Sequence, residues 1–308
     1  IIVISLAIRI IDANFTNPYN ISNLVRPVRR AVSPHRGRGY FCPIAQNRED
    51  PMYTLGIDIG STTSKCAVLK DGKELVARSL QTGGLGTGGP EEALAQLWQT
   101  SGLTRADMAC AFVTGYGRKN YEGADGEISE LTAHALGGRF VFPDLRTVID
   151  IGGQDAKVIA LSPSGKMVNF VMNDKCAAGT GRFLDVMASI LRLDVDDLDA
   201  EAAKAAAPAA ISSTCTVFAE SEVISQLANG VRRPDLVAGI CRSVASRVAA
   251  LARRAGVTEQ VCLSGGVARN DAVRQALSEE LNVPVSVDPL VQYFGAIGAA
   301  LWAYKQMT

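Results

Sequence analysis

Two stretches of the chain, Leu55–Lys65 and Val148–Lys157, repeat one pattern of apolar and polar residues. Each begins as a run of β-branched and other apolar residues, which is typical of a buried strand. Each then meets an aspartate, Asp58 or Asp150, and a glycine at which the chain must turn sharply. The repetition predicts two similar half-domains.

A β-hairpin is predicted after each of these turns. In the first repeat, Asp71-Gly72 separates the strand segments 66–70 and 74–80 and is a strong two-residue turn signal. In the second repeat, apolar segments lie on either side of Ser162–Gly165. Backbone N–H groups converge at the mouth of such a hairpin, and its carboxylate can hold a hydrated Mg²⁺. Two such hairpins facing each other would hold the phosphates of one nucleotide.

A third glycine turn follows near the end of the chain. The sequence predicts a strand over Gln260–Ser264, a turn at Gly265-Gly266 and a helix over Asp271–Leu281. A glycine pair allows a flat ring to lie against bare backbone. Asp-x-Gly alone is also ordinary turn chemistry. The two copies with matching hairpins, together with this third turn, favour nucleotide binding.

The composition is that of an ordinary globular protein. The chain has 308 residues, of which 47% are apolar and 20% charged. Strands alternate with helices, so the fold class is α/β. The net charge of zero gives no electrostatic indication of nucleic acid or an anionic membrane as a partner. Seven cysteines without a secretory signal favour a reducing, cytoplasmic location.

Residues 1–51 differ from the rest of the chain. They contain arginine pairs such as Arg29-Arg30, show no sustained periodicity and precede Met52. We expect a poorly ordered or non-native extension here, followed by one lobe over 52–145 and a second over 146–308. The apolar run 1–8 is too short to span a bilayer, so we expect no membrane association; a membrane anchor is the alternative.

Two cysteines lie in polar loops of small residues just ahead of predicted helices. Cys176 precedes the helical segment 182–191, and Cys215 precedes 217–228. Helix N-termini stabilise anionic sulfur, so these thiols suit reactivity or metal binding. Their separation does not fit a local zinc knuckle, and two ligands are too few for a closed site. A site on a two-fold axis would gain four ligands from two chains, as an iron–sulfur cluster needs. The alternative is two ordinary thiols that cap helices.

The other cysteines of the folded region fit apolar patterns. We expect them to be small buried hydrophobic residues: Cys66, Cys110 and Cys262 on strands, and Cys241 on the helix predicted over 235–254.

Six segments together resemble the activator ATPases of 2-hydroxyacyl-CoA dehydratases, of the BadF/BadG/BcrA/BcrD type, which also include the ATPase subunits of benzoyl-CoA reductase. The segments are Asp58–Lys65, Thr114–Arg118, Asp150–Lys157, Asn173–Phe183, Thr216–Val223 and Gly265–Asn270. The resemblance extends from Met52 to about Met307, and its most specific parts are the two cysteine segments.

The resemblance implies an actin-like (ribonuclease H-like) duplicated fold with ATP or ADP and Mg²⁺ in the cleft between two lobes. It also implies a homodimer holding one 4Fe-4S cluster, with Cys176 and Cys215 of each chain as its ligands. Reduced ferredoxin or flavodoxin would supply one electron, and ATP hydrolysis would drive its transfer to a dehydratase component. We expect both cysteine loops to lie on one lobe and to face the dimer axis.

The resemblance also suggests roles for individual residues. Asp58 and Asp150 are expected beside Mg²⁺ and the attacking water, with Gln154 and Asp155 also close enough in sequence to act on water. Lys65 and Lys157 either reach a phosphate or are solvated surface charges. The expected nucleotide-binding residues are Gly60, Ser61, Thr62, Thr63, Lys65, Gly152, Gly153, Asp155, Lys157, Gly265, Gly266 and Asn270.

His134 lies on a helix predicted over 129–136, and we interpret it as a packing residue on an apolar face rather than a base. Two other functions are considered. A small-molecule kinase of the same superfamily needs a substrate pocket, and the sequence has no evident extra substrate domain. A nucleotide-switched interaction protein could use Ala200–Ala210 as a mobile insertion, although this segment is more simply a helix stopped at Pro208.

Overall fold

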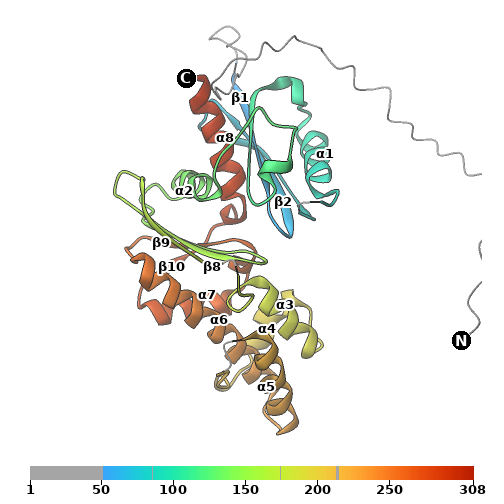
Figure 1. The fold of residues 1–308 in the computed structure, drawn as a ribbon, viewed down its shortest axis with the longest axis vertical. Helices are drawn as coiled ribbons and strands as arrows, with labels where there is room; N and C mark the ends of the chain where they lie inside the picture. The colour runs from blue at the N-terminus through green and yellow to red at the C-terminus, as the bar shows by residue number, and fades with distance from the viewer. Residues whose placement is uncertain (1–50, 85, 174, 213–214) are drawn as a thin grey trace, which may run out of the picture. The chain divides into compact units, whose positions relative to one another are not determined.

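The structure is a computed structural model that describes residues 51–84, 86–173, 175–212 and 215–308. The extension expected over 1–51 therefore lies almost entirely outside the described residues. The described chain forms two five-stranded mixed sheets with helices packed against them (Figure 1).

The first sheet has the strand order β3-β2-β1-β4-β5. Strand β1 pairs antiparallel with β2 and parallel with β4. Asp71 and Gly72 join β2 to β3 with φ of 53° and 64°, the positive values that a tight hairpin turn requires. The predicted hairpin is thus confirmed. The strands are β1 (Tyr53–Ile59), β2 (Thr63–Lys70), β3 (Glu74–Thr82), β4 (Met108–Thr114) and β5 (Gly126–Glu127).

The second sheet repeats this arrangement with the order β10-β9-β6-β7-β8. Its central strand β6 pairs antiparallel with β7 and parallel with β9, as β1 does with β2 and β4. The repeated sequence thus corresponds to a repeated sheet arrangement. The strands are β6 (Thr147–Ile151), β7 (Ala156–Leu161), β8 (Met167–Asn173), β9 (Val261–Ser264) and β10 (Val285–Ser286).

Helices cover the sheets, and the largest apolar core lies around the second sheet. The predicted helices occur within a few residues of their expected bounds. The helices of the described chain are α1 (Gly89–Ser101), α2 (Glu130–Val141), α3 (Gly181–Ile190), α4 (Leu198–Ala202), α5 (Thr216–Ala228), α6 (Arg233–Ala255), α7 (Asp271–Leu281) and α8 (Phe294–Met307). Of these, α2, α3, α5, α6 and α7 are the ones predicted from the sequence.

The expectation of a helix continuing to Pro208 is wrong. Helix α4 ends at Ala202, well before the proline. The backbone N–H groups of Ala206 and Ala209 instead donate to the side chain and the carbonyl of Asp235, over 2.7 and 2.8 Å. The high helix propensity of alanine is overridden here by tertiary hydrogen bonds at the start of α6.

Helix α8 comes last in the chain but packs on the first sheet, against β1, β2 and β4. It also crosses α2 with almost no space between the two backbones. A Cβ on Gly298 would overlap the carbonyl oxygen of Ala133, and one on Gly137 would overlap that of Phe294. Helix α8 belongs to the segment 146–308, which we expected to form the second lobe, yet it packs on the first sheet.

Gly298→Ala is expected to destabilise the protein by about 2–3 kcal/mol, because the added methyl group forces two closely packed helices apart. Chemical denaturation with urea measures this change. Gly266→Ala is the control, since the nearest atom to a Cβ there is Gln292 Nε2 at 4.0 Å. Equal stability of the two variants would show that the helices separate without cost.

Candidate active site

A cavity of about 330 Å³ lies between the ends of the two sheets. The turns β1–β2 and β6–β7 and the glycine pair after β9 line it. It brings together nearly all the residues predicted to act on a nucleotide: Asp58, Gly60, Ser61, Thr62, Thr63, Lys65, Asp150, Gly152, Gly153, Gln154, Asp155, Lys157, Gly265 and Gly266.

The two repeated turns have the same internal hydrogen bond and approach each other. Gly60 N–H donates to the Thr63 carbonyl over 3.0 Å, and Gly152 N–H donates to the Asp155 carbonyl over 2.9 Å. A Cβ on Gly153 would lie only 2.5 Å from Cγ2 of Thr62. The turns therefore face each other as the sequence predicted, and glycine at position 153 makes this approach feasible.

Asp58 has an oxygen without a hydrogen-bond partner. Its side chain lines the cavity and is buried, and no described residue donates to its Oδ1. The Lys65 ammonium is 3.7 Å from the other carboxylate oxygen. A buried carboxylate oxygen without a donor is unfavourable in isolation, and a hydrated Mg²⁺ would satisfy it. The donor set thus fits a magnesium ion.

Asp150, the equivalent aspartate of the second repeat, is fully engaged. It accepts hydrogen bonds from Ser264 Oγ over 2.7 Å and from Lys157 Nζ over 2.9 Å. Burial alone would raise its pKa, but the attraction of Lys157 and His134 and the Ser264 hydrogen bond outweigh burial and hold the pKa well below its usual value. Asp150 is therefore ionised and fixed in place, unlike the incompletely satisfied Asp58.

Lys157 is buried, so the surface-charge interpretation of this residue is wrong. Its side chain is 2% exposed, and its ammonium lies 2.7 Å from Glu130, 2.9 Å from Asp150 and 3.0 Å from Asp155. Burial favours the neutral amine, but these three carboxylates raise the pKa of Lys157 well above its ordinary value. The surface interpretation is also wrong for Lys65, which lines the cavity with 14% of its side chain exposed. A phosphate contact by either lysine stays a prediction.

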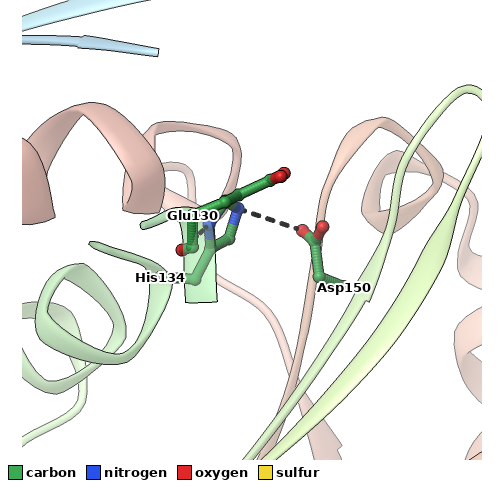
Figure 2. A group of neighbouring side chains, drawn as sticks. All are labelled: Glu130, His134 and Asp150. Atoms are coloured by element: carbon green, nitrogen blue, oxygen red, sulfur yellow. Dashed lines mark hydrogen bonds and ion pairs between the residues drawn. The ribbon is translucent and has the colours of Figure 1, made fainter. Parts of the chain in front are cut away.

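His134 lines the cavity rather than packing on an apolar face, which corrects our interpretation of it. Its Nδ1 is 2.9 Å from the carbonyl oxygen of Glu130, and its Nε2 is 3.5 Å from Asp150 Oδ1 (Figure 2). A carbonyl oxygen can only accept, so Nδ1 carries a proton and Nε2 is directed toward the carboxylate. The sequence pattern missed this because the partner lies on another element.

Glu130 was not predicted as a site residue. It is the first residue of α2, directly after the capping Ser129, and lines the cavity beside His134. Glu130, His134 and Asp150 place one ligand atom each within 4.8 Å of one another (Figure 2). The Lys157 ammonium contacts two of the three, so a protein cation already balances this group. No local motif marks Glu130, and only the tertiary ion pair reveals it.

Asn270 does not line the cavity, so its expected nucleotide contact is not supported. Its Oδ1 accepts the Val273 N–H over 2.8 Å and thereby caps α7. Asparagine before a helix is a common capping residue, and this structural role accounts for it here. Tyr116 and Gln292, which were not predicted, do line the cavity.

Cys176 and Cys215 are exposed, free thiols on the part of the chain that carries the second sheet. Cys215 is the N-cap residue of α5. Cys176 lies between β8 and α3, where the Asn173 side chain donates to its carbonyl over 2.9 Å. Helices α3 and α5 contact each other, so the two cysteines precede neighbouring helices.

The remaining cysteines of the described chain are buried, as their apolar sequence patterns predicted. They are Cys66, Cys110, Cys241 and Cys262. Burial raises the pKa of Cys66 and of Cys241 to about 12, so these two thiols stay protonated at neutral pH. The chemistry of thiolates is therefore favoured at the two exposed cysteines.

The first turn of α3 is bound directly to the β6–β7 turn. Gly181 N–H donates to the Gly152 carbonyl over 2.9 Å, and Arg182 N–H donates to the Gly153 carbonyl over 2.8 Å. The loop that carries Cys176 runs directly into this helix. A displacement of the glycine turn therefore acts on the helix that follows the cysteine.

Within the described residues, no helix is long and apolar enough to cross a membrane.

Comparisons with known proteins give a consistent relationship. The chain is 57% identical over 256 residues to the (R)-2-hydroxyglutaryl-CoA dehydratase activating ATPase of Acidaminococcus fermentans, covering 83% of this chain and 98% of that protein. It is 52% identical over 255 residues to the 2-hydroxyisocaproyl-CoA dehydratase activator of Clostridioides difficile, covering 83% and 96%.

Solved structures agree with these relatives. The crystal structure of the Acidaminococcus fermentans dehydratase component A matches with a TM-score of 0.81, covering 83% of this chain and 99% of that one. The Clostridium difficile activator with bound ADPNP also matches with a TM-score of 0.81, at 52% identity and with 83% and 96% of the chains covered. The expected actin-like duplicated fold is confirmed. The model of the BadF/BadG/BcrA/BcrD ATPase family matches residues 55–303, and the chain belongs to this family.

Proposed function

We propose that this chain is an ATP-hydrolysing activator that delivers one low-potential electron to a 2-hydroxyacyl-CoA dehydratase. The observation that carries the proposal is the combination, in one chain, of a cavity lined by the two glycine turns and two exposed cysteines near it. Cys176 precedes α3, which is hydrogen-bonded to the β6–β7 turn, and Cys215 precedes α5, which contacts α3. The relatives named above are activators of such dehydratases, which supports the assignment. A kinase would leave the two exposed thiols without a role.

ATP would lie in the cavity with its phosphates between the two facing turns. Asp58 would take the magnesium ion through its unpartnered oxygen, and Asp150 would stay on the side of the attacking water, close to Gln154. Gly265 and Gly266 would face the adenosine. Backbone N–H groups and the hydroxyls of the first turn, together with the buried Lys157, would offset the phosphate charge.

The two exposed cysteines fit one half of an iron–sulfur site. Thiolates are the ligands that such clusters use, and four are needed. Cys176 and Cys215 supply two per chain, so a homodimer with one shared 4Fe-4S cluster completes the set. When bound, the cluster carries one electron at low potential. The protein's part is to hold the Cys176 thiol in the loop before α3 and the Cys215 thiol at the start of α5, which contacts α3.

Nucleotide hydrolysis would act on the electron through the backbone contacts of α3. The carbonyls of Gly152 and Gly153 bind the first N–H groups of this helix. If the turn shifts when the γ-phosphate leaves, α3 and the Cys176 loop shift with it, and the dipole field at the thiol changes. The electron would come from reduced ferredoxin or flavodoxin, in the cytoplasm, and pass to the dehydratase component.

The test is the amount of iron and acid-labile sulfide per protomer after anaerobic purification. We expect about two irons per protomer in the wild type and none in Cys176→Ser or Cys215→Ser. Cys66→Ala is the control, since Cys66 is a free but buried thiol, and it should retain its iron. Wild-type protein without iron but with ATP turnover would overturn the electron-transfer proposal in favour of a kinase or a switch ATPase.

A further inference from the structure

One of the three carboxylates that contact the Lys157 ammonium comes from outside the second sheet. Asp150 lies directly opposite Lys157 in the β6–β7 pairing, and Asp155 lies in the adjoining turn. Glu130 comes from α2, a helix that packs mainly against α8. The distance from Lys157 Nζ to Glu130 Oε1, 2.7 Å, is the shortest of the three contacts.

Glu130 is not needed to neutralise the lysine. Asp150 and Asp155 already provide two negative charges for one ammonium group. The pKa of Glu130 is nevertheless held below its usual value, because Lys157 and His134 outweigh the effect of its burial. Glu130 is therefore ionised, although its charge is not needed to neutralise Lys157. Its effect is to pull the Lys157 ammonium toward α2.

The pull of Glu130 on the Lys157 ammonium acts at the wall of the cavity. Glu130, Lys157 and Asp155 all line the cavity. The Lys157 ammonium therefore lies at the cavity wall, between a carboxylate of α2 and the carboxylates of the second sheet. The Glu130 carboxylate is 22% side-chain exposed, whereas Lys157 is almost fully buried. Helix α2 is itself fixed by its close crossing with α8, where Gly298 meets Ala133.

We propose that Glu130 is a positioning residue for ATP hydrolysis that acts through Lys157. It shares the Lys157 ammonium with Asp150 and Asp155 and pulls it toward the α2 side of the cavity wall, so that this cation faces the phosphates between the two turns. This role rests on ATP hydrolysis, the activity of the family, and is independent of the cluster. His134 assists by fixing the backbone carbonyl of Glu130 and the far side of Asp150.

Loss of the Glu130 charge is expected to affect the chemical step more than binding. The two turns and the glycine pair that hold the nucleotide stay intact, so KM for MgATP should change less than about threefold. Without Glu130, the ammonium would be held by Asp150 and Asp155 alone and would stabilise the transition state less well. A decrease in kcat of about tenfold to a hundredfold is the usual effect of losing an orienting partner.

The experiment compares Glu130→Gln and Glu130→Asp with Glu127→Gln in steady-state phosphate release and in urea unfolding. Glu127 is a carboxylate on nearby β5 that does not line the cavity, and its variant should keep wild-type kinetics. Glu130→Gln should lose kcat with little change in KM or stability, and Glu130→Asp should recover part of kcat.

Three results would overturn the proposal. They are an unchanged kcat in Glu130→Gln, an equal loss in Glu127→Gln, or a stability loss that accounts for the lower kcat. Iron content is measured in the same samples. Protein that lacks iron but shows the expected kcat pattern would contradict the electron-transfer function and leave the role of Glu130 supported.

Discussion

Lys157→Met is expected to destabilise the protein by about 3–5 kcal/mol, the usual cost of removing one partner from a buried ionic group. The substitution leaves Glu130, Asp150 and Asp155 close together without their shared cation. Methionine fills a similar volume, so the loss is electrostatic rather than steric. Urea unfolding of the nucleotide-free protein at neutral pH measures it.

The first repeat provides a matched control for this variant. Lys65 occupies the equivalent strand position but contacts one carboxylate, Asp58, at 3.7 Å. Lys65→Met should therefore cost much less stability. The double variant Glu130→Gln/Lys157→Met should regain part of the stability lost in Lys157→Met, because one uncompensated charge is removed. Equal losses for the two lysine variants would contradict a special electrostatic role of Lys157.

Asp58→Asn is expected to reduce kcat for ATP hydrolysis by at least about a hundredfold. The amide keeps the size of the side chain but removes the charge that would hold Mg²⁺, and metal stabilisation of the transferred phosphate is worth several kcal/mol. Phosphate release at saturating MgATP measures the change. Nucleotide binding, followed separately by calorimetry, should persist because both turns remain.

Asp71→Asn is the control for Asp58→Asn. Asp71 lies at the far end of the same hairpin, outside the cavity, and accepts the Met52 N–H over 2.9 Å. Its variant should hydrolyse ATP at the wild-type rate. Wild-type turnover in Asp58→Asn would place the metal ion elsewhere, with the fully engaged Asp150 as the remaining candidate.

The sequence predicted the fold and most of the cavity because their signals are local. Glycine, aspartate and the alternation of apolar residues mark turns and strands wherever they occur. The repeat therefore located both hairpins, and the apolar period located α7 between Asp271 and Leu281. The two exposed cysteines were also distinguishable from the buried ones, since their flanking residues are polar rather than apolar.

The errors concern residues whose environment is set by distant partners. Lys157 ends the repeated sequence segment and could be taken for a solvated lysine, yet its pairing with Glu130 depends on where the fold places the first residue of α2. His134 has an apolar helical neighbourhood in sequence but faces Asp150 in space. Charge pairing of this kind leaves no periodic pattern in a single sequence.

The position of α8 bears on how the protein is made. Strands β1, β2 and β4 bury their apolar residues against a helix that is translated after both sheets. During synthesis, the face of the first sheet that α8 covers stays exposed until α8 has left the ribosome. The face of the first sheet that α8 covers is therefore completed last, and until then its apolar surface favours aggregation.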